Sequence, residues 1–220
     1  RLVRAGRMNR YGWIRAARSR LTRTAARDGF RILFKTPYGF ELLLPCSYHD
    51  FILAAMDGVL FHSTLRQVLE YVVRPGHTIV DGGSYIGFVS LLAARLLRGQ
   101  GSVFAFEPDP DTVELLKENV TRNDCGALVR VEQKALTDQN HFVQFCRWES
   151  EPMRNSIVTG DRDDTVRVSG VRLDDYLAEA GSARPDVIKL DLEGAEPLAL
   201  AGMSKSVQSA QLLIYEVNKT

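Results

Sequence analysis

The segment from Thr78 to Gly87, TIVDGGSYIG, constrains the fold of this chain more than any other part of it. Its β-branched residues are typical of a buried central strand, and Asp81 followed by two glycines marks a turn where the backbone can approach a ligand closely. Gly87 then opens an apolar run with helical spacing. We therefore predict an α/β fold with a doubly wound, mostly parallel sheet, in which this turn faces the crevice at the carboxyl ends of the strands.

The pattern of the turn is Asp-x-Gly-x-x-x-Gly and differs from the dinucleotide pattern Gly-x-Gly-x-x-Gly. A carboxylate just before the glycines would repel a pyrophosphate, but it suits a ligand with a positive end, such as the amino group of S-adenosylmethionine. The candidate cofactor contacts in this turn are Asp81, Gly82, Gly83, Ser84 and Gly87.

Strand and helix patterns alternate around this turn, which implies parallel strands joined by right-handed crossovers. Two alternating segments flank a polar stretch at 149–164, so we expect an inserted antiparallel pair whose loop contributes to an acceptor pocket. The expected strands are 77–81, 103–106, 128–132, 187–191 and 211–217, the expected helices are about 86–98, 110–123 and a short one from Asp174, and the inserted pair is 141–148 with 165–173.

Three parts are expected along the chain. Residues 1–28 are rich in arginine, and we expect a solvated helix or a disordered arm, with an amphipathic helix on an anionic membrane or on nucleic acid as the alternative. Residues 29–75 form a hairpin, 31–35 with 40–44, followed by helices at about 51–59 and 65–72 that pack on the core. Residues 76–220 form the Rossmann-like core.

Composition limits the classes of partner and the cellular compartment that are expected. A formal net charge of +1 argues against a dedicated nucleic-acid binder. The three cysteines at 46, 125 and 146 share no C-x-x-C spacing, so neither a disulfide framework nor a zinc site is suggested, and a reducing, cytoplasmic compartment is expected. No apolar run approaches the ~18 residues of a membrane span.

Acidic residues follow the strands of the predicted crevice. Glu107 lies 20 residues after Gly87, at the end of the second strand, where a carboxylate can accept both ribose hydroxyls of an adenosyl group. The adjacent Pro108, and Ala135 at the end of the third strand, complete the predicted cofactor site. A helix-start acid is the alternative role for Glu107.

Lys189, Asp191 and Glu193 are alternate residues that share one face of the sheet if the fourth strand continues. We predict that Lys189 and Asp191 stand beside the methyl donor and acceptor, with Glu216 at the end of the neighbouring strand. A structural ion pair of Lys189 with one carboxylate is the alternative. An acceptor hydroxyl must lose its proton, so Asp191 with Glu216 offers either a base or a divalent-metal site.

In this order and spacing, several segments together resemble the FkbM-type S-adenosylmethionine-dependent methyltransferases over residues ~40–217. They are VDGGSYIG at 80–87, FAFEPDP at 104–110, Leu115 with Asn119 and Asn123, ALTD at 135–138, LDD at 173–175 and IKLDLEGAE at 188–196. The resemblance implies a class I Rossmann-like fold and O-methylation of a hydroxyl on a sugar or other small molecule. It also implies a seven-stranded sheet, whereas only five parallel strands can be counted. We therefore expect either a fragment of a longer protein or a partner, such as a second copy, on the exposed fifth strand.

Other function classes remain open at this point. A non-catalytic binding or scaffold protein that keeps the fold would bind cofactor without turnover. A nicotinamide dehydrogenase should carry Gly-x-Gly-x-x-Gly, which is absent here. A nucleic-acid base methyltransferase normally needs an Asn/Asp-Pro-Pro-aromatic turn after the fourth strand, where this chain has Asp191-Leu192-Glu193-Gly194.

Overall fold

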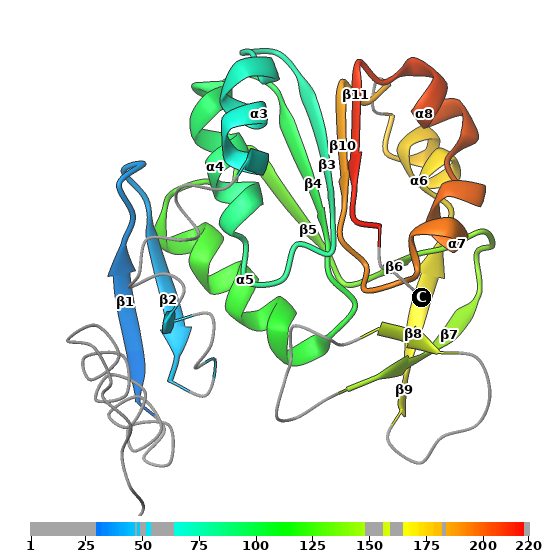
Figure 1. The fold of residues 1–220 in the computed structure, drawn as a ribbon, viewed down its shortest axis with the longest axis horizontal. Coiled ribbons are helices and arrows are strands. Elements are labelled where there is room, and N and C mark those ends of the chain that lie inside the picture. Colours follow the sequence, from blue (N-terminus) through cyan, green and yellow to red (C-terminus); the bar gives the residue numbers. More distant parts are fainter. Residues whose placement is uncertain are drawn as a thin grey trace, which may run out of the picture.

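The computed structural model describes residues 30–46, 48, 52–53, 64–147, 156–158, 165–181 and 184–217. The basic arm at 1–28, nearly all of the predicted helix at 51–59 and most of the polar stretch at 149–164 lie outside these residues. Within them, the order of elements begins with a hairpin, continues with alternating strands and helices, and includes a small second sheet (Figure 1).

A five-stranded parallel sheet forms the centre of the molecule (Figure 1). Its order is β11-β10-β3-β4-β5, and every neighbouring pair is parallel, as predicted. β3 and β10 are buried along their whole length, which the β-branched residues in both strands favour. The strands are β3 (Thr78–Gly82), β4 (Ser102–Phe106), β5 (Val129–Glu132), β10 (Val187–Leu190) and β11 (Leu212–Tyr215).

Helices cover both faces of this sheet, as a doubly wound fold requires (Figure 1). On one face lie α3 (Thr64–Val72), α4 (Phe88–Leu97) and α5 (Pro110–Arg122), and on the other lie α6 (Leu173–Glu179), α7 (Glu196–Ala201) and α8 (Ser204–Ser209). The predicted start of α5 is confirmed, because Asp109 accepts hydrogen bonds from the backbone N–H groups of Asp111 and Thr112. The short helices α7 and α8 were not predicted.

The predicted N-terminal hairpin is confirmed, with β1 (Arg31–Lys35) antiparallel to β2 (Glu41–Pro45). The hydroxyl group of Thr36 closes its turn by donating to the carbonyl oxygen of Phe40, 2.7 Å away. The apolar side of β2 belongs to the same core as α4 and α5, so the hairpin is packed on the sheet's helical layer.

A second, four-stranded sheet has the order β6-β9-β7-β8. The predicted antiparallel pair is confirmed as β7 (Phe142–Cys146) with β9 (Thr165–Val171). β6 (Ala135–Leu136) pairs with β9 in parallel, which ties this sheet to the end of β5. β8 (Ser156–Val158) lies inside the stretch that was predicted to be loop, because three residues are too few to show an alternating pattern.

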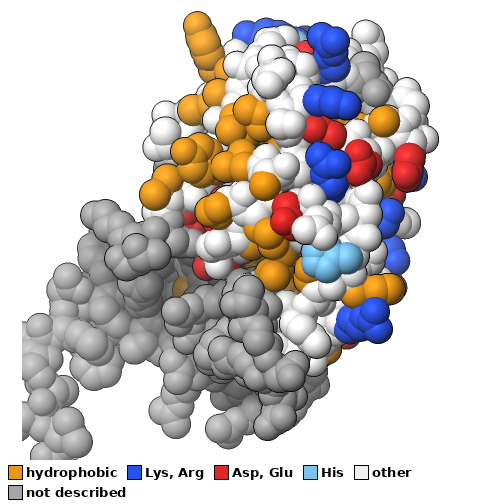
Figure 2. All heavy atoms as spheres, turned by 90° about the vertical axis from the view of Figure 1, so that its right-hand side faces the viewer, with side chains coloured by type: hydrophobic (Ala, Val, Ile, Leu, Met, Phe, Trp, Pro, Cys, Tyr) orange, Lys and Arg blue, Asp and Glu red, His pale blue; other side chains and the backbone are white. Residues whose placement is uncertain are grey.

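Figure 2 shows the face on which α6, α7 and α8 lie, with hydrophobic side chains gathered toward one side and charged side chains of both signs toward the other. β11 forms the sheet edge next to these helices, and its side chains are only half-buried, with Tyr215 exposed. Among the described helices, none is both long and apolar enough to cross a bilayer.

Candidate functional site

Asp81 is the fourth of the five residues of β3, directly before the glycine turn, and its side chain is completely buried. The Ser90 hydroxyl group on α4 donates to Asp81 Oδ2 over 2.6 Å, and Lys189 Nζ lies 3.2 Å from Oδ1. Burial of a carboxylate is tolerated here because it has both a hydrogen-bond donor and an opposite charge. The Asp81 carboxylate is therefore directed toward Ser90 and Lys189 in the interior of the protein.

Lys189 on β10 is also buried, with 4% of its surface exposed. Besides its ion pair with Asp81, Nζ donates to the carbonyl oxygens of Gly82 at 3.1 Å and Gly83 at 2.8 Å. Asp191 Oδ2 lies farther away, at 3.8 Å. The structure thus shows the ion pair that the sequence left open as the alternative, and Lys189 joins β10 to the glycine turn.

The glycines of the turn are required by space and by backbone conformation. Gly83 has a φ of +71°, and a Cβ atom there would lie 1.9 Å from the backbone oxygen of Asp191. Gly87 has a φ of +95°, and a Cβ atom there would lie 2.6 Å from Leu116. Such conformations and distances exclude ordinary side chains. The close approach of Gly83 brings the start of the acidic turn after β10 against the glycine turn.

Ser84 and Tyr85 complete the turn. The Ser84 hydroxyl group donates to the backbone oxygen of Asp81 at 2.6 Å, so it fixes the turn internally. Tyr85 has a left-handed φ of 50° although it carries a large side chain. Its ring stacks on Tyr48, with ring centres 5.3 Å apart and an interplanar angle of 16°. Burial raises the pKa of Tyr85 above its ordinary value, so the phenol keeps its proton.

Glu107 follows β4 directly, at the carboxyl end of the strand next to β3. One carboxylate oxygen accepts the backbone N–H of Tyr85 at 2.9 Å, and the other accepts that of Asp109 at 3.0 Å. Burial raises the pKa of Glu107 to about 7, although these two hydrogen bonds act in the opposite direction. The adjacent Pro108 is buried, and Ala135 is buried in β6, a strand of the second sheet that follows the end of β5.

Asp191, Glu193 and Glu216 form the acidic cluster of the crevice, in which one carboxylate oxygen from each residue lies within 4.8 Å of the other two. The fourth strand does not continue through Asp191 and Glu193, because β10 ends at Leu190 and Glu193 has a left-handed φ of 53° in the turn that follows. Alternation along one strand is therefore the wrong reason for their proximity. Partial burial, and then hydrogen bonding and repulsion from Asp191, raise the pKa of Glu216. One acid of this pair therefore retains a proton more readily than an isolated acid would.

Three residues that hold the site were not singled out as site residues from the sequence. Ser90 supports Asp81, and Asn119 on α5 donates to the Ile86 oxygen at the end of the glycine turn. Glu196 is buried and accepts the backbone N–H groups of Leu192 and Gly194, which closes the turn that carries Glu193. Polar residues within the apolar stripes of α4 and α5 are the signal that would have found the first two.

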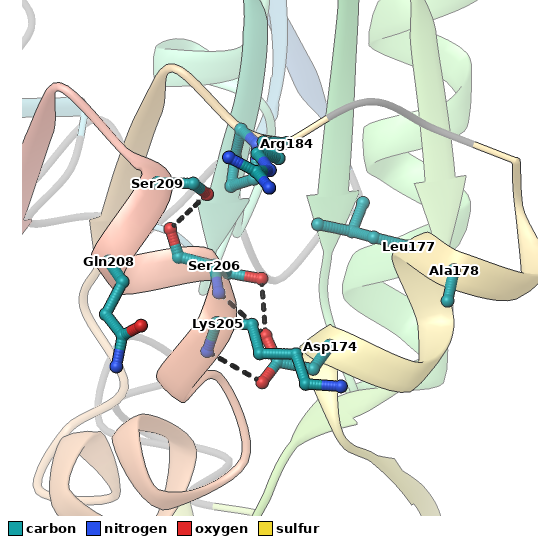
Figure 3. A pocket seen from close by; sticks show the side chains of 9 residues that line it. Asp174, Leu177, Ala178, Arg184, Lys205, Ser206, Gln208 and Ser209 are labelled. Carbon is teal, nitrogen blue, oxygen red and sulfur yellow. Dashed lines mark hydrogen bonds between the residues drawn. The ribbon is translucent and has the colours of Figure 1, made fainter.

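A separate cavity of about 440 Å³ lies between α6, α8 and the segment before β10. Figure 3 shows Ser206 and the start of α8 turned toward Asp174, which accepts from the backbone N–H groups of Lys205 and Ser206 and from the Ser206 hydroxyl group. Since Arg184 and Pro185 precede β10, this cavity opens at the opposite end of the sheet from the acidic cluster. None of the predicted site residues lines it.

The sequence profile of the methyltransferase FkbM domain matches residues 81–220. The match begins at the buried acid of the glycine turn and includes Glu107 and the acidic cluster.

Two curated relatives act on sugars or on hydroxyl positions according to their names. The hexuronic acid methyltransferase AglP of Haloferax volcanii is 28% identical over 139 residues, which are 63% of this chain and 54% of that protein. The 2-O-methyltransferase NoeI of Sinorhizobium fredii is 28% identical over 167 residues, 69% of this chain and 67% of that protein. The ribosomal protein L11 methyltransferase of Chloroflexus aurantiacus is 36% identical over 95 residues, 40% of this chain and 28% of that protein.

Among these relatives the chain spans about half of AglP and little more than a quarter of the L11 methyltransferase. Among solved structures, methyltransferase FkbM from Methylobacillus flagellatus aligns with 93% of this chain and 49% of its own, with a TM-score of 0.46 and 16% identity. A SAM-dependent methyltransferase from Agrobacterium tumefaciens aligns with 87% of this chain and 55% of its own, with a TM-score of 0.48 and 12% identity.

Proposed function

The chain belongs to the FkbM family of S-adenosylmethionine-dependent methyltransferases, and we propose that it methylates a hydroxyl group on a carbohydrate or another small molecule. One observation carries the proposal: the glycine turn, Glu107 and Asp191 converge at the carboxyl ends of neighbouring strands β4, β3 and β10. In open α/β sheets this is the crevice where ligands bind.

Glu107 is suited to the ribose of the cofactor. A carboxylate has about four acceptor positions, and two of them are taken by the N–H groups of Tyr85 and Asp109. The remaining positions match the two ribose hydroxyls. Pro108 and Ala135 are assigned to the adenosyl side, and Gly82, Gly83, Ser84 and Gly87 supply backbone that a ligand can approach closely.

Asp81 and Lys189 support this cofactor site from the buried side of the glycine turn. Because both are buried and paired, we assign Lys189 to positioning the turn, through its bonds to the Gly82 and Gly83 oxygens. Asp81 in turn holds Lys189 and contributes negative charge beneath the positively charged methionine end of the cofactor.

Asp191 is assigned to the acceptor. When bound, S-adenosylmethionine supplies the methyl group, and the acceptor oxygen forms the new C–O bond as the S–C bond breaks. The hydroxyl proton passes to the Asp191 carboxylate, which is exposed and close to the glycine turn. Alignment of the acceptor oxygen and exclusion of water supply the rest of the rate enhancement. Glu216 faces Asp191 as a partner for that proton.

A divalent cation is the alternative for activating the hydroxyl group, since Asp191, Glu193 and Glu216 each offer one carboxylate oxygen. A chelator distinguishes activation of the hydroxyl group by a cation from activation by Asp191 as the base. Turnover that persists in EDTA supports Asp191 as the base, whereas loss of turnover that Mg²⁺ restores supports the cation.

A carbohydrate acceptor is proposed because AglP and NoeI, by name, methylate a hexuronic acid and a 2-hydroxyl position. The half-buried β11 edge is the proposed contact for a second copy, and the arginine-rich arm at 1–28 is a proposed contact for an anionic membrane surface. Three thiols without a disulfide fit the cytoplasm.

The test is a methyl-transfer assay with labelled S-adenosylmethionine against a panel of sugars and uronic acids, with cofactor binding measured by calorimetry in parallel. Cofactor binding with transfer to a hydroxyl group supports the proposal. Cofactor binding without transfer to any acceptor favours the non-catalytic scaffold, and absence of cofactor binding contradicts both.

A further inference from the structure

Asn119 on α5 and Asn123, which caps the carboxyl end of that helix, bind the backbone of the N-terminal hairpin. Asn119 Oδ1 accepts the Leu43 N–H at 2.7 Å, and its Nδ2 donates to the Leu43 oxygen at 3.3 Å. Asn123 repeats this with Glu41, accepting at 2.8 Å and donating at 2.7 Å. Each amide therefore binds the backbone of one β2 residue as a neighbouring strand would.

The spacing of the two asparagines matches the spacing of alternate residues in β2, because of helix and strand geometry. Residues four apart on a helix rise about 6 Å, and residues two apart on a strand rise about 6.6 Å, so amides at i and i+4 meet alternate strand residues. β2 pairs with β1 through one edge, and its other edge is satisfied by these amides. Asn119 is completely buried, so the energetic cost of leaving its amide unpaired is high.

The two asparagines differ in one contact. Asn119 Nδ2 also donates to the Ile86 oxygen at 3.0 Å, which belongs to the glycine turn. The corresponding third contact of Asn123 is the Asn119 oxygen at 2.7 Å, within its own helix. Asn119 is thus bonded to both the hairpin and the glycine turn, whereas Asn123 is bonded to the hairpin alone.

A second contact joins the same two regions. Tyr48, two residues after the described end of the hairpin segment, stacks on Tyr85 of the glycine turn. Tyr85 in turn donates its N–H to Glu107. The hairpin side of the molecule is therefore connected to the turn at Ile86 through an amide and at Tyr85 through a ring.

We propose that Asn119 is a positioning residue for the cofactor site, which couples docking of the β1–β2 hairpin to the conformation of the glycine turn. The inference rests on the proposed function, since it assigns a residue that acts on the same cofactor through Ile86. Docking of the hairpin and binding of S-adenosylmethionine then favour each other, because coupling between two sites is reciprocal.

Asn119→Ala and Asn123→Ala form a matched pair for the test. Both remove two hydrogen bonds to β2, and we expect similar falls in melting temperature. Calorimetry should show cofactor affinity about tenfold weaker in Asn119→Ala and changed less than about twofold in Asn123→Ala, since one hydrogen bond to the turn is lost only in the first. Equal effects of the two variants on affinity, or none in either, would overturn the inference.

Hydrogen exchange on the wild-type chain tests the coupling without any substitution. S-adenosylmethionine should slow exchange at the amides of Glu41 and Leu43, and unchanged exchange in the saturated protein contradicts the inference while leaving the proposed function intact. If Asn119→Ala does not fold, hydrogen exchange on the wild-type chain still tests the inference. A wild-type chain that binds no cofactor overturns the proposed function and the inference with it.

Discussion

The two sides of the crevice hold their charged groups in opposite ways. On the proposed cofactor side, Asp81 and Glu107 are buried, and each has donors from the surrounding protein. On the proposed acceptor side, Asp191 and Glu216 are exposed and lie against each other. The first side is preorganised, so that changes there alter stability and cofactor affinity. The second side is electrostatically unfavourable by itself, and changes there should alter turnover.

The largest expected effect is on stability, from Lys189→Met. It leaves Asp81 buried without its cation, which typically costs about 3–5 kcal/mol in unfolding free energy. Urea unfolding measures the loss. Lys205→Met, at an exposed lysine, is the control and should change stability by less than about 0.5 kcal/mol. The double variant Asp81→Asn with Lys189→Met should recover part of the loss, and no recovery would contradict the pairing.

Asp191→Asn should lower turnover about 100-fold or more while cofactor affinity stays within about twofold, because the proposed base is lost but the ribose contact is not. Stability should rise slightly, since one of three neighbouring negative charges is removed. Single-turnover methyl transfer on an authentic acceptor measures the effect. Full turnover in this variant would remove Asp191 from the mechanism.

Glu107→Ala should weaken cofactor binding by about 1–3 kcal/mol, roughly five- to a hundredfold, because two ribose hydroxyls lose their acceptor. Calorimetry measures the affinity, and Glu114→Ala, at an exposed acid of α5, is the control. Unchanged affinity in Glu107→Ala would place the ribose elsewhere.

How far the sequence predicts this structure depends on the range of the interactions involved. The alternation of strands and helices, the start of α5 at Pro110 and the N-terminal hairpin follow from local patterns, and all three were predicted correctly. The pairing of Asp81 with Lys189 joins residues far apart in the chain, so the sequence offered only a structural ion pair of Lys189 with an unspecified carboxylate. The contact of Asn119 with Leu43 was not predicted, since the register between a helix and a strand edge is set by packing.

The acidic turn after β10 shows a different limit. Strand alternation predicted that Lys189, Asp191 and Glu193 share a face, but a left-handed residue and the buried Glu196 turn the chain instead. The acids still come together, and Lys189 Nζ lies nearer to Asp81 and the Gly83 oxygen than to Asp191.

A pH titration tests whether burial of Glu107 matters for binding, and its effect on cofactor affinity is the smallest of those expected. Its pKa of about 7 in the folded protein exceeds the ordinary value of about 4.3. Between these values the folded state binds more protons than the unfolded state, so stability of the cofactor-free protein should fall as pH rises from about 4 to 7 and level off above. Glu107→Gln should remove this part of the pH dependence.

Cofactor affinity should change in the opposite direction. Ribose hydroxyls donate to a carboxylate more strongly than to a neutral carboxyl group, so affinity should increase a few-fold as pH rises through about 7. Titration of cofactor binding between pH 6 and 8 measures this, with Glu107→Gln expected to bind more weakly at pH 8 and with a flat profile. A wild-type profile as flat as that of the variant would mean that Glu107 is already ionised throughout. Burial would then be offset by the N–H groups of Tyr85 and Asp109.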